Sequence, residues 1–245
     1  MRIYTVRVFF CSIILVNENK WLPLLNKNAC IRKNIQCYME IKRDLYLNKL
    51  IRSMHNGMIK VVTGIRRCGK SYLLFNIFSD YLKAQGVDDE HIIKVDLEDR
   101  RNKNLRNPDA LLEYIDARIA KEGMHYVMLD EVQWVDEFED VLNSYLKIPN
   151  VDVYVTGSNS KFLSSDVITE FRGRGDEIKV APLSFSEFFS VFEGSREEAM
   201  EEYMTFGGLP MIATMQSNEE KMKYLQTLFK KTYITDILER YKIKN

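Results

Sequence analysis

The sequence predicts an α/β three-layer sandwich, in which a mostly parallel five-stranded sheet lies between helices and a small helical lid subdomain follows. From about residue 58, short apolar segments alternate with amphipathic segments. Strands separated by helices of this length pair in parallel, and the helices cover both faces of the sheet. The chain has 245 residues, of which 46% are hydrophobic and 29% charged. This composition is typical of a globular protein with a buried core.

Five segments have the apolar, β-branched character of strands that are buried on both faces of a sheet. In chain order, the predicted strands span residues 58–64, 91–99, 125–133, 151–160 and 176–180. Other segments show apolar residues at helical spacing. These predicted helices span residues 39–51, 71–86, 107–123 and 137–147. Pro108 near one helix start, and Gly86 and Gly123 at helix ends, fit the residue preferences of helix termini.

The chain is predicted to have three parts. Residues 39–183 hold all five predicted strands and form the predicted core domain. Residues 184–245 hold only predicted helices, at 196–207, 208–216 and 219–241. In the last of these, apolar residues recur every four positions, which indicates a helix packed against others. We therefore expect residues 184–245 to form the lid.

Residues 1–38 are expected to be an extension outside the functional fold. They carry six basic side chains and one acidic one, which leaves a net charge of −5 on the remainder. An acidic body argues against strong non-specific DNA binding, although a local basic patch stays open. The apolar stretch VFFCSIILV is too short to span a bilayer, and no small-residue cleavage site follows it. A cytoplasmic protein without a membrane segment is therefore predicted.

The cysteines and histidines show no metal-binding pattern. The four cysteines are Cys11, Cys30, Cys37 and Cys68. None forms a C-x-x-C pair and no histidine lies near them, so a zinc site is not expected. The three histidines, His55, His91 and His125, have no ligand partners at useful spacing. This usage fits a reducing compartment such as the cytoplasm.

The stretch GIRRCGKS, residues 64–71, matches the P-loop pattern at every defined position. Gly64 and Gly69 allow backbone turns that other residues resist, and they let N–H groups approach phosphate oxygens. Lys70 supplies a positive charge for the β- and γ-phosphates, and Ser71 an oxygen ligand for Mg²⁺. The pattern follows an apolar strand and opens an apolar helix, as phosphate binding at a helix N-terminus requires. A P-loop NTPase that binds ATP and Mg²⁺ is therefore predicted.

The predicted nucleotide contacts comprise the whole loop, the start of the next helix and one serine after the fourth strand. They are Gly64, Ile65, Arg66, Arg67, Cys68, Gly69, Lys70, Ser71, Tyr72 and Ser158. Arg66 and Arg67 are alternatively available for pairing with acidic partners, and Arg67 is preferred for the nucleotide. Cys68 lies in the loop, but its side chain is interpreted as packing material.

Two carboxylates follow the third predicted strand, in the stretch YVMLDE. Asp130 is predicted to hold Mg²⁺, and Glu131 to accept a proton from, or to align, the water that attacks the γ-phosphate. The carboxyl ends of strands are where doubly wound sheets bind ligands. An ordinary acidic turn at a strand end is the alternative, and the P-loop makes it less favoured.

Polar residues after the fourth strand are candidates for sensing the γ-phosphate. Thr156, Ser158 and Asn159 all have suitable side chains, and we select Ser158 and Asn159. Arg172 and Arg174 precede the fifth predicted strand. One of them, with Arg174 preferred, is predicted to reach a nucleotide in a neighbouring subunit of a homo-oligomer. Solvated loop arginines are an equal alternative.

Several of these motifs together resemble a known family. GIRRCGKS, VMLDEVQ, TGSNS, GRGDEIKVAPLSFSEF and FGGLP occur in the order and spacing of prokaryotic AAA-type ATPases that carry a C-terminal domain of unknown function. The likeness runs from about Met39 to the last residue. It implies that Lys70, Ser71, Asp130 and Glu131 carry the ATPase roles, while Arg174 matches the arginine of the family's GR pair. The family's C-terminal domain would begin where this sequence stops, so a truncated product is expected.

The leading functional hypothesis is an Mg²⁺-dependent ATPase, with Glu131, Lys70, Arg174 and Asn159 as catalytic residues. The alternative is an ATP-dependent switch or scaffold with little turnover, with DNA association open only by analogy. A GTPase is less favoured because no N-K-x-D motif for guanine recognition occurs. The protein partner and the biological pathway stay open.

Overall fold

The computed structural model describes residues 41–119, 121–157, 171, 173–230 and 234. Lys42–Asn245 form one compact unit, and the predicted extension, residues 1–38, lies outside the described residues. The predicted boundary between a core domain and a lid at residue 183 therefore stays a proposal. Within the described part of the chain, no helix combines the length and apolar character needed to cross a membrane.

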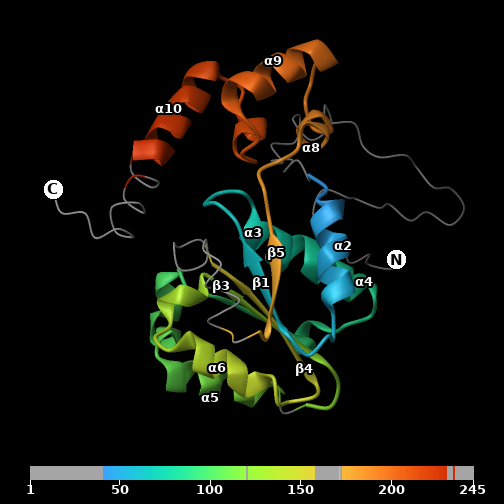
Figure 1. Cartoon of the computed structure of the whole chain (residues 1–245), viewed down its shortest axis with the longest axis vertical. Coiled ribbons are helices and arrows are strands. Elements are labelled where there is room, and N and C mark those ends of the chain that lie inside the picture. Colours follow the sequence, from blue (N-terminus) through green and yellow to red (C-terminus); the bar gives the residue numbers. More distant parts are fainter. Residues whose placement is uncertain (1–40, 120, 158–170, 172, 231–233, 235–245) are drawn as a thin grey trace, which may run out of the picture. The chain divides into compact units, whose positions relative to one another are not determined.

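A five-stranded sheet forms the centre of the fold, with the strand order β2-β3-β4-β1-β5. The strands are β1 (Ile59–Thr63), β2 (Ile92–Asp96), β3 (His125–Asp130), β4 (Val151–Thr156) and β5 (Gly175–Lys179). Every neighbouring pair is parallel. The predicted α/β sandwich with a parallel five-stranded sheet is confirmed. Because all strands run the same way, their carboxyl ends share one edge of the sheet (Figure 1).

Helices cover both faces of this sheet (Figure 1). One face carries α2 (Asp44–Ser53) and the helix that follows the P-loop; the other carries α5 (Pro108–Ile119) and α6 (Phe138–Tyr145). Successive side chains of a strand point to opposite faces. Accordingly Val61 belongs to the core under α5 and α6, whereas Val62 belongs to the core under α2.

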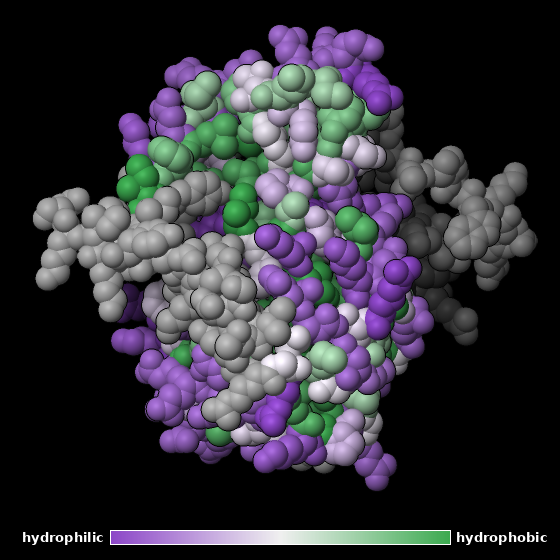
Figure 2. All heavy atoms as spheres, viewed as in Figure 1, coloured by the Kyte–Doolittle hydropathy of each residue, from purple (hydrophilic) through white to green (hydrophobic). Residues whose placement is uncertain are grey.

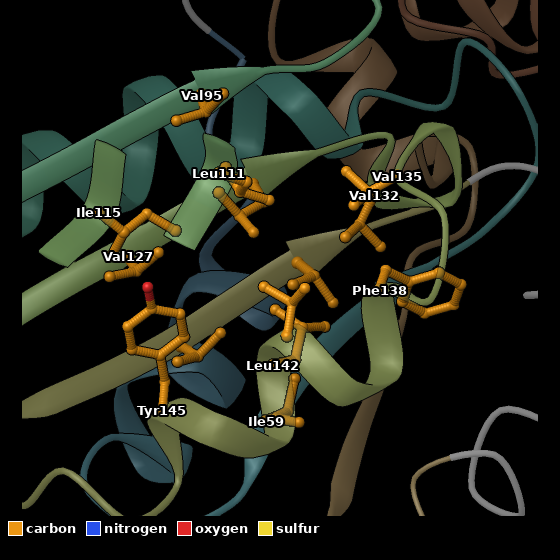
Figure 3. Packing of buried hydrophobic residues seen from close by; sticks show 14 of the residues in the cluster. Ile59, Val95, Leu111, Ile115, Val127, Val132, Val135, Phe138, Leu142 and Tyr145 are labelled. Carbon is orange, nitrogen blue, oxygen red and sulfur yellow. The ribbon is translucent and has the colours of Figure 1, made fainter. Parts of the chain in front are cut away.

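The core under α5 and α6 is the larger of the two, and its side chains are directed toward one another (Figure 3). Leu111 and Ile115 of α5 and Leu142 of α6 are fully buried there, against strand residues such as Val127. Burial of each such side chain contributes roughly 1.5–3 kcal/mol to folding. This packing fixes the strands whose ends carry the candidate site.

The helix after the P-loop, predicted at 71–86, contains a π-helical segment. Its successive parts are α3 (Lys70–Tyr72), η1 (Leu73–Phe78) and α4 (Ser79–Ala84). Lys94 of β2 donates from Nζ to the carbonyl oxygen of Phe75 within this segment, at 2.6 Å. Short π segments inside α-helices occur frequently at functional sites.

Short 3₁₀ helices lie in several connections: η2 (Asp89–His91), η3 (Arg100–Arg106) and η4 (Val132–Trp134). After the sheet come α8 (Phe185–Phe189), α9 (Arg196–Phe206), η6 (Ile212–Thr214) and α10 (Asn218–Leu228). Both α8 and α9 begin with a capping box, Ser184 with Glu187 and Ser195 with Glu198.

The helical part differs from the prediction in two places, and part of a third predicted helix lies outside the described residues. The helix predicted at 208–216 is wrong, because only Ile212–Thr214 is helical there and Gly207, Gly208 and Pro210 disfavour a longer helix. The helix α8 was not predicted. Of the helix predicted at 219–241, α10 covers the first part, and the residues beyond 230 other than 234 lie outside the described residues.

Polar residues cover most of the face in Figure 2, and hydrophobic residues gather in its upper part. Several methionines of the helical part contribute to the exposed apolar surface. Met204 of α9 is 79% exposed and Met222 of α10 is 46% exposed.

A buried ion pair ties β1 to β4. The ammonium of Lys60, which is fully buried, pairs with Asp152. Asp152 also accepts hydrogen bonds from the hydroxyl of Tyr154, at 2.7 Å, and from the backbone N–H of His55, at 3.0 Å. Burial and this carboxylate raise the pKa of Tyr154 well above its usual value. The network fixes the amino-terminal edge of the sheet, which is the edge away from the P-loop.

The burial of His125 predicts that the free energy of unfolding depends on pH. Its ring is fully buried at the start of β3 and packs on His91, with ring centroids 4.7 Å apart. Burial, and secondarily the charge of His91, lower the pKa of His125. Protonation therefore favours the unfolded chain, where a histidine titrates near pH 6.5. Stability should be full above about pH 6.5 and decline as the pH falls below it.

The variant His125→Phe keeps a ring in the core but cannot be protonated. We expect its free energy of unfolding, measured by urea titration at pH 7.5 and 5.5, to fall less between these values than that of the wild type. An equal fall in both proteins would contradict the assignment.

Candidate functional site

The P-loop leaves β1 at Thr63 and curls at the carboxyl edge of the sheet. Gly64 has a φ of +145°, and a Cβ there would lie 2.2 Å from the carbonyl oxygen of Val180. Only glycine fits at this position, since both the backbone conformation and the close approach of Val180, just after β5, exclude a side chain. Gly69, with a φ of +97°, makes the turn into α3. The two glycines predicted from the motif are thus required by the geometry of the loop.

Lys70 is almost fully buried, with 4% of its surface exposed. Its ammonium donates to the carbonyl oxygens of Gly64, at 3.1 Å, and Ile65, at 3.2 Å. The side chain therefore folds back over its own loop, with its charge inside the curl. Hydrogen bonds of this kind contribute about 1.5–3 kcal/mol, and a phosphate can replace them because it carries a full negative charge.

Asp130 ends β3 at the same edge and is 5% exposed. Burial raises the pKa of its carboxyl group; hydrogen bonds from the hydroxyls of Thr156 and Ser71 oppose this, and the carboxylates of Glu131 and Asp96 add to it. The influence of the Ser71 hydroxyl on the pKa of Asp130 indicates that the start of the P-loop helix lies close to the acidic strand end. The two halves of the predicted site therefore lie at the same edge of the sheet.

The oxygens of Ser71 and Asp130 form a donor set that fits Mg²⁺. Hydroxyl and carboxylate oxygens are the hard ligands that this cation takes, and it commonly uses one or two protein ligands together with substrate phosphates. A buried carboxylate whose pKa is raised also gains from a neighbouring divalent cation. Among the described residues, no group of three or more His, Cys, Asp or Glu side chains forms an all-protein metal cage.

Glu131 follows in a left-handed backbone conformation, with φ 54° and ψ 50°. Its side chain is 8% exposed, its N–H donates to Thr156 Oγ1 at 3.0 Å, and its Oε2 accepts from the amide of Gln133. A non-glycine residue in this conformation is strained, and such strain persists where the surroundings impose it, often at functional sites. The carboxylate of Glu131, which is predicted to act on water, is thus held by Gln133, a residue that was not predicted to belong to the site.

Thr156, one of the three polar candidates after the fourth strand, joins the two acidic residues of the site. Its hydroxyl donates to Asp130 Oδ1 and accepts the N–H of Glu131. It therefore bridges both acidic residues. In the register of β3 and β4, Leu129 pairs with Val155, so Asp130 and Thr156 end neighbouring strands. A polar residue at the end of the fourth predicted strand is the sequence signal that indicates this role. Ser158 and Asn159, which were selected instead, lie outside the described residues.

The remaining predicted loop residues differ in exposure. Ile65 is 39% and Tyr72 44% exposed, and Arg66 is partly buried. Arg67 is exposed and has a φ of 67°. Cys68 is fully buried, with its Sγ 3.0 Å from the position a Cβ on Gly64 would take. Burial raises the pKa of the Cys68 thiol, which agrees with its interpretation as packing material.

Arg174 lies at the opposite edge of the sheet. It immediately precedes β5, and its carbonyl oxygen accepts the N–H of Ile59 at the start of β1, at 2.9 Å. The P-loop follows the other end of β1, so the exposed Arg174 is not part of the site in its own chain. Its predicted action on a neighbouring subunit stays a prediction, and Arg172 lies outside the described residues.

The helical part contacts the P-loop. A Cβ on Gly69 would lie 3.6 Å from Cγ of Pro210, in the GGLP stretch. Burial raises the pKa of Tyr224 in α10, and the charge of Arg67 opposes this shift. Gly208 accepts the N–H of Leu183 at 2.7 Å, which ties the GGLP stretch to the segment after β5.

Comparison with known proteins agrees with this geometry. A family model described as an AAA domain matches residues 56–189, which is more than half of the 245 residues. The match includes β1, the P-loop, the acidic strand end and the start of the helical part.

Two curated relatives are uncharacterized proteins. One, from Haemophilus influenzae, is 32% identical over 84% of this chain and 52% of its own length. The other, from Methanocaldococcus jannaschii, is 31% identical over 84% of this chain and 46% of its own length. The chain thus spans about half the length of the curated relatives it matches.

Among solved structures, a Walker-type ATPase of Pyrococcus abyssi is similar, with a TM-score of 0.58 and 18% identity over 83% of this chain and 76% of that chain. At this identity the likeness shows the fold alone. It agrees with the parallel sheet that is described above. The chain belongs to the AAA domain family of P-loop ATPases.

Proposed function

We propose that this protein hydrolyses ATP to ADP and phosphate with Mg²⁺. The observation that carries the proposal is the hydrogen-bonded chain from Asp130 through Thr156 to Glu131. These two buried carboxylates lie at the same edge of the sheet as the phosphate loop. A phosphate-binding loop alone would support only binding, whereas a carboxylate fixed beside it supports attack by water.

Each residue has a separate role in this proposal. Loop amides and the Lys70 ammonium bind the phosphates, and the positive end of the helix that starts at Lys70 favours their charge. Ser71 and Asp130 would hold Mg²⁺, which when bound offsets the negative charge of the phosphates. Glu131 orients the attacking water and accepts its proton. Thr156 fixes both acidic residues and is a positioning residue.

A nucleotide-dependent switch with little turnover is the second candidate. One observation favours it: the carboxylate of Glu131 accepts a hydrogen bond from Gln133, and this contact competes with water. In this alternative, ATP binding would change the conformation of the helical part, whose Pro210 lies beside Gly69. The two candidates share the binding site and differ in the rate of phosphate release.

The variant Glu131→Gln separates the candidates. It keeps the shape of the side chain but removes its ability to accept a proton, so we expect steady phosphate release to fall by about a hundredfold or more. Binding of Mg·ATP, followed by a fluorescent analogue, should persist. Negligible turnover already in the wild type, together with tight binding, would instead support the switch.

The predicted role of Arg174 implies that ATP turnover per chain depends on protein concentration. If its guanidinium acts on a nucleotide in a neighbouring subunit, turnover per chain should rise with concentration, and Arg174→Ala should abolish that rise. The exposed Arg52 in the last turn of α2 provides a matched control, since Arg52→Ala also removes an exposed guanidinium. A flat rate per chain in the wild type would remove the argument for action between subunits.

A further inference from the structure

Arg43, which precedes all of the motifs named above, contacts the backbone of the P-loop. Arg43 lies just before α2 and is 5% exposed, although arginine is rarely buried unless it is paired. Its Nη1 donates to the carbonyl oxygen of Cys68 at 3.4 Å. We propose that Arg43 is a positioning residue for ATP binding, which fixes the orientation of the Cys68–Gly69 peptide. This inference rests on the proposed binding of ATP at the P-loop.

The effect follows from the planarity of the peptide group. In a trans peptide, the carbonyl of one residue and the N–H of the next point in opposite directions. Because the carbonyl of Cys68 is directed at Arg43, the N–H of Gly69 points away from it. This N–H belongs to the loop whose amides bind phosphate. The guanidinium of Arg43 therefore determines the direction of the Gly69 N–H.

Arg43 is itself held by the segment after β5. Its Nη2 donates to the carbonyl oxygen of Ala181 at 2.6 Å, and its Nε pairs with Glu187 Oε1 at 3.2 Å. Its guanidinium lies 4.6 Å from the centre of the Tyr46 ring, and the hydroxyl of Tyr46 accepts the N–H of Ala181. The fixed planar fork of arginine suits these simultaneous contacts, whereas lysine offers a point charge.

The same contacts connect the P-loop to the start of the helical part. Glu187, the partner of Arg43, also caps α8 through its Oε2, which accepts the N–H of Ser184 at 2.8 Å. On the other side of the loop, Val180 stands against Gly64 and donates its N–H to Thr63 at 2.8 Å. A shift of α8 would therefore move the side chain of Arg43, which bonds the carbonyl oxygen of Cys68. The P-loop is held from behind by Arg43 and from the side by β5.

The test compares Arg43→Lys with the wild type. Lysine keeps the charge but cannot bond Cys68, Ala181 and Glu187 in the same geometry, so we expect the Kd for Mg·ATP and the KM to rise about tenfold. The kcat should change much less, because Glu131 and Asp130 are untouched. Arg52→Lys, a change of an exposed arginine in α2, the helix that follows Arg43, is the matched control and should leave Kd, KM and kcat unchanged.

Cys68 provides a second readout within the loop. It is fully buried behind the P-loop, and its alkylation can be followed by mass spectrometry of the peptide that contains it. We expect faster alkylation in Arg43→Lys than in the wild type or Arg52→Lys, at a temperature where circular dichroism shows all three proteins folded. Millimolar guanidinium added to Arg43→Ala should restore part of the lost ATP affinity, which a purely structural defect would not allow.

The outcomes are distinct. If the wild type does not bind Mg·ATP, the proposed function fails. If the wild type binds and Arg43→Lys, folded, has the same Kd and the same alkylation rate, the role of Arg43 is overturned. If Arg43→Lys unfolds, Arg43→Gln, which retains an amide donor, takes its place with the same expectations and the same refuting result.

Discussion

The structure depends on one chain of hydrogen bonds at the carboxyl edge of the sheet. Thr156 at the end of β4 bonds both Asp130, which ends β3, and Glu131, which follows it. The parallel order β3-β4-β1 brings these strand ends together with the start of the P-loop. In the proposed function, this arrangement adds a metal ligand and a proton acceptor to a phosphate-binding loop.

The buried parts of the molecule serve to hold this edge still. On one face, α5 and α6 pack on the strands, and at the far edge Lys60 and Asp152 join β1 to β4. Behind the loop, Arg43 links the Cys68 carbonyl to the segment after β5. The helical part reaches the loop through Pro210, which lies beside Gly69. In the proposed nucleotide-dependent switch, this contact would let the helical part respond to the nucleotide.

The sequence predicts the sheet and the P-loop well, because both rest on local signals. Buried strands are continuous apolar runs, and the loop needs glycine, lysine and serine at fixed spacing. It did not single out Arg43, and it named Thr156 without selecting it, because the roles of both depend on contacts between distant segments. It also did not predict Gln133, which bonds Glu131 two residues away. Arg43 looks like one exposed arginine of an amphipathic helix until the fold buries it. The helix predicted at 208–216 failed because apolar periodicity outweighed two glycines and a proline.

Isothermal titration of the full chain with Mg·ATP measures the central claim most directly, namely that the loop and its buried lysine bind a triphosphate. The account predicts a measurable heat of binding for the wild type and an affinity at least about tenfold lower for Lys70→Ala, since a charge-assisted hydrogen bond contributes roughly 1.5–3 kcal/mol. Absence of binding by the folded wild type, or equal affinity in both proteins, would contradict it.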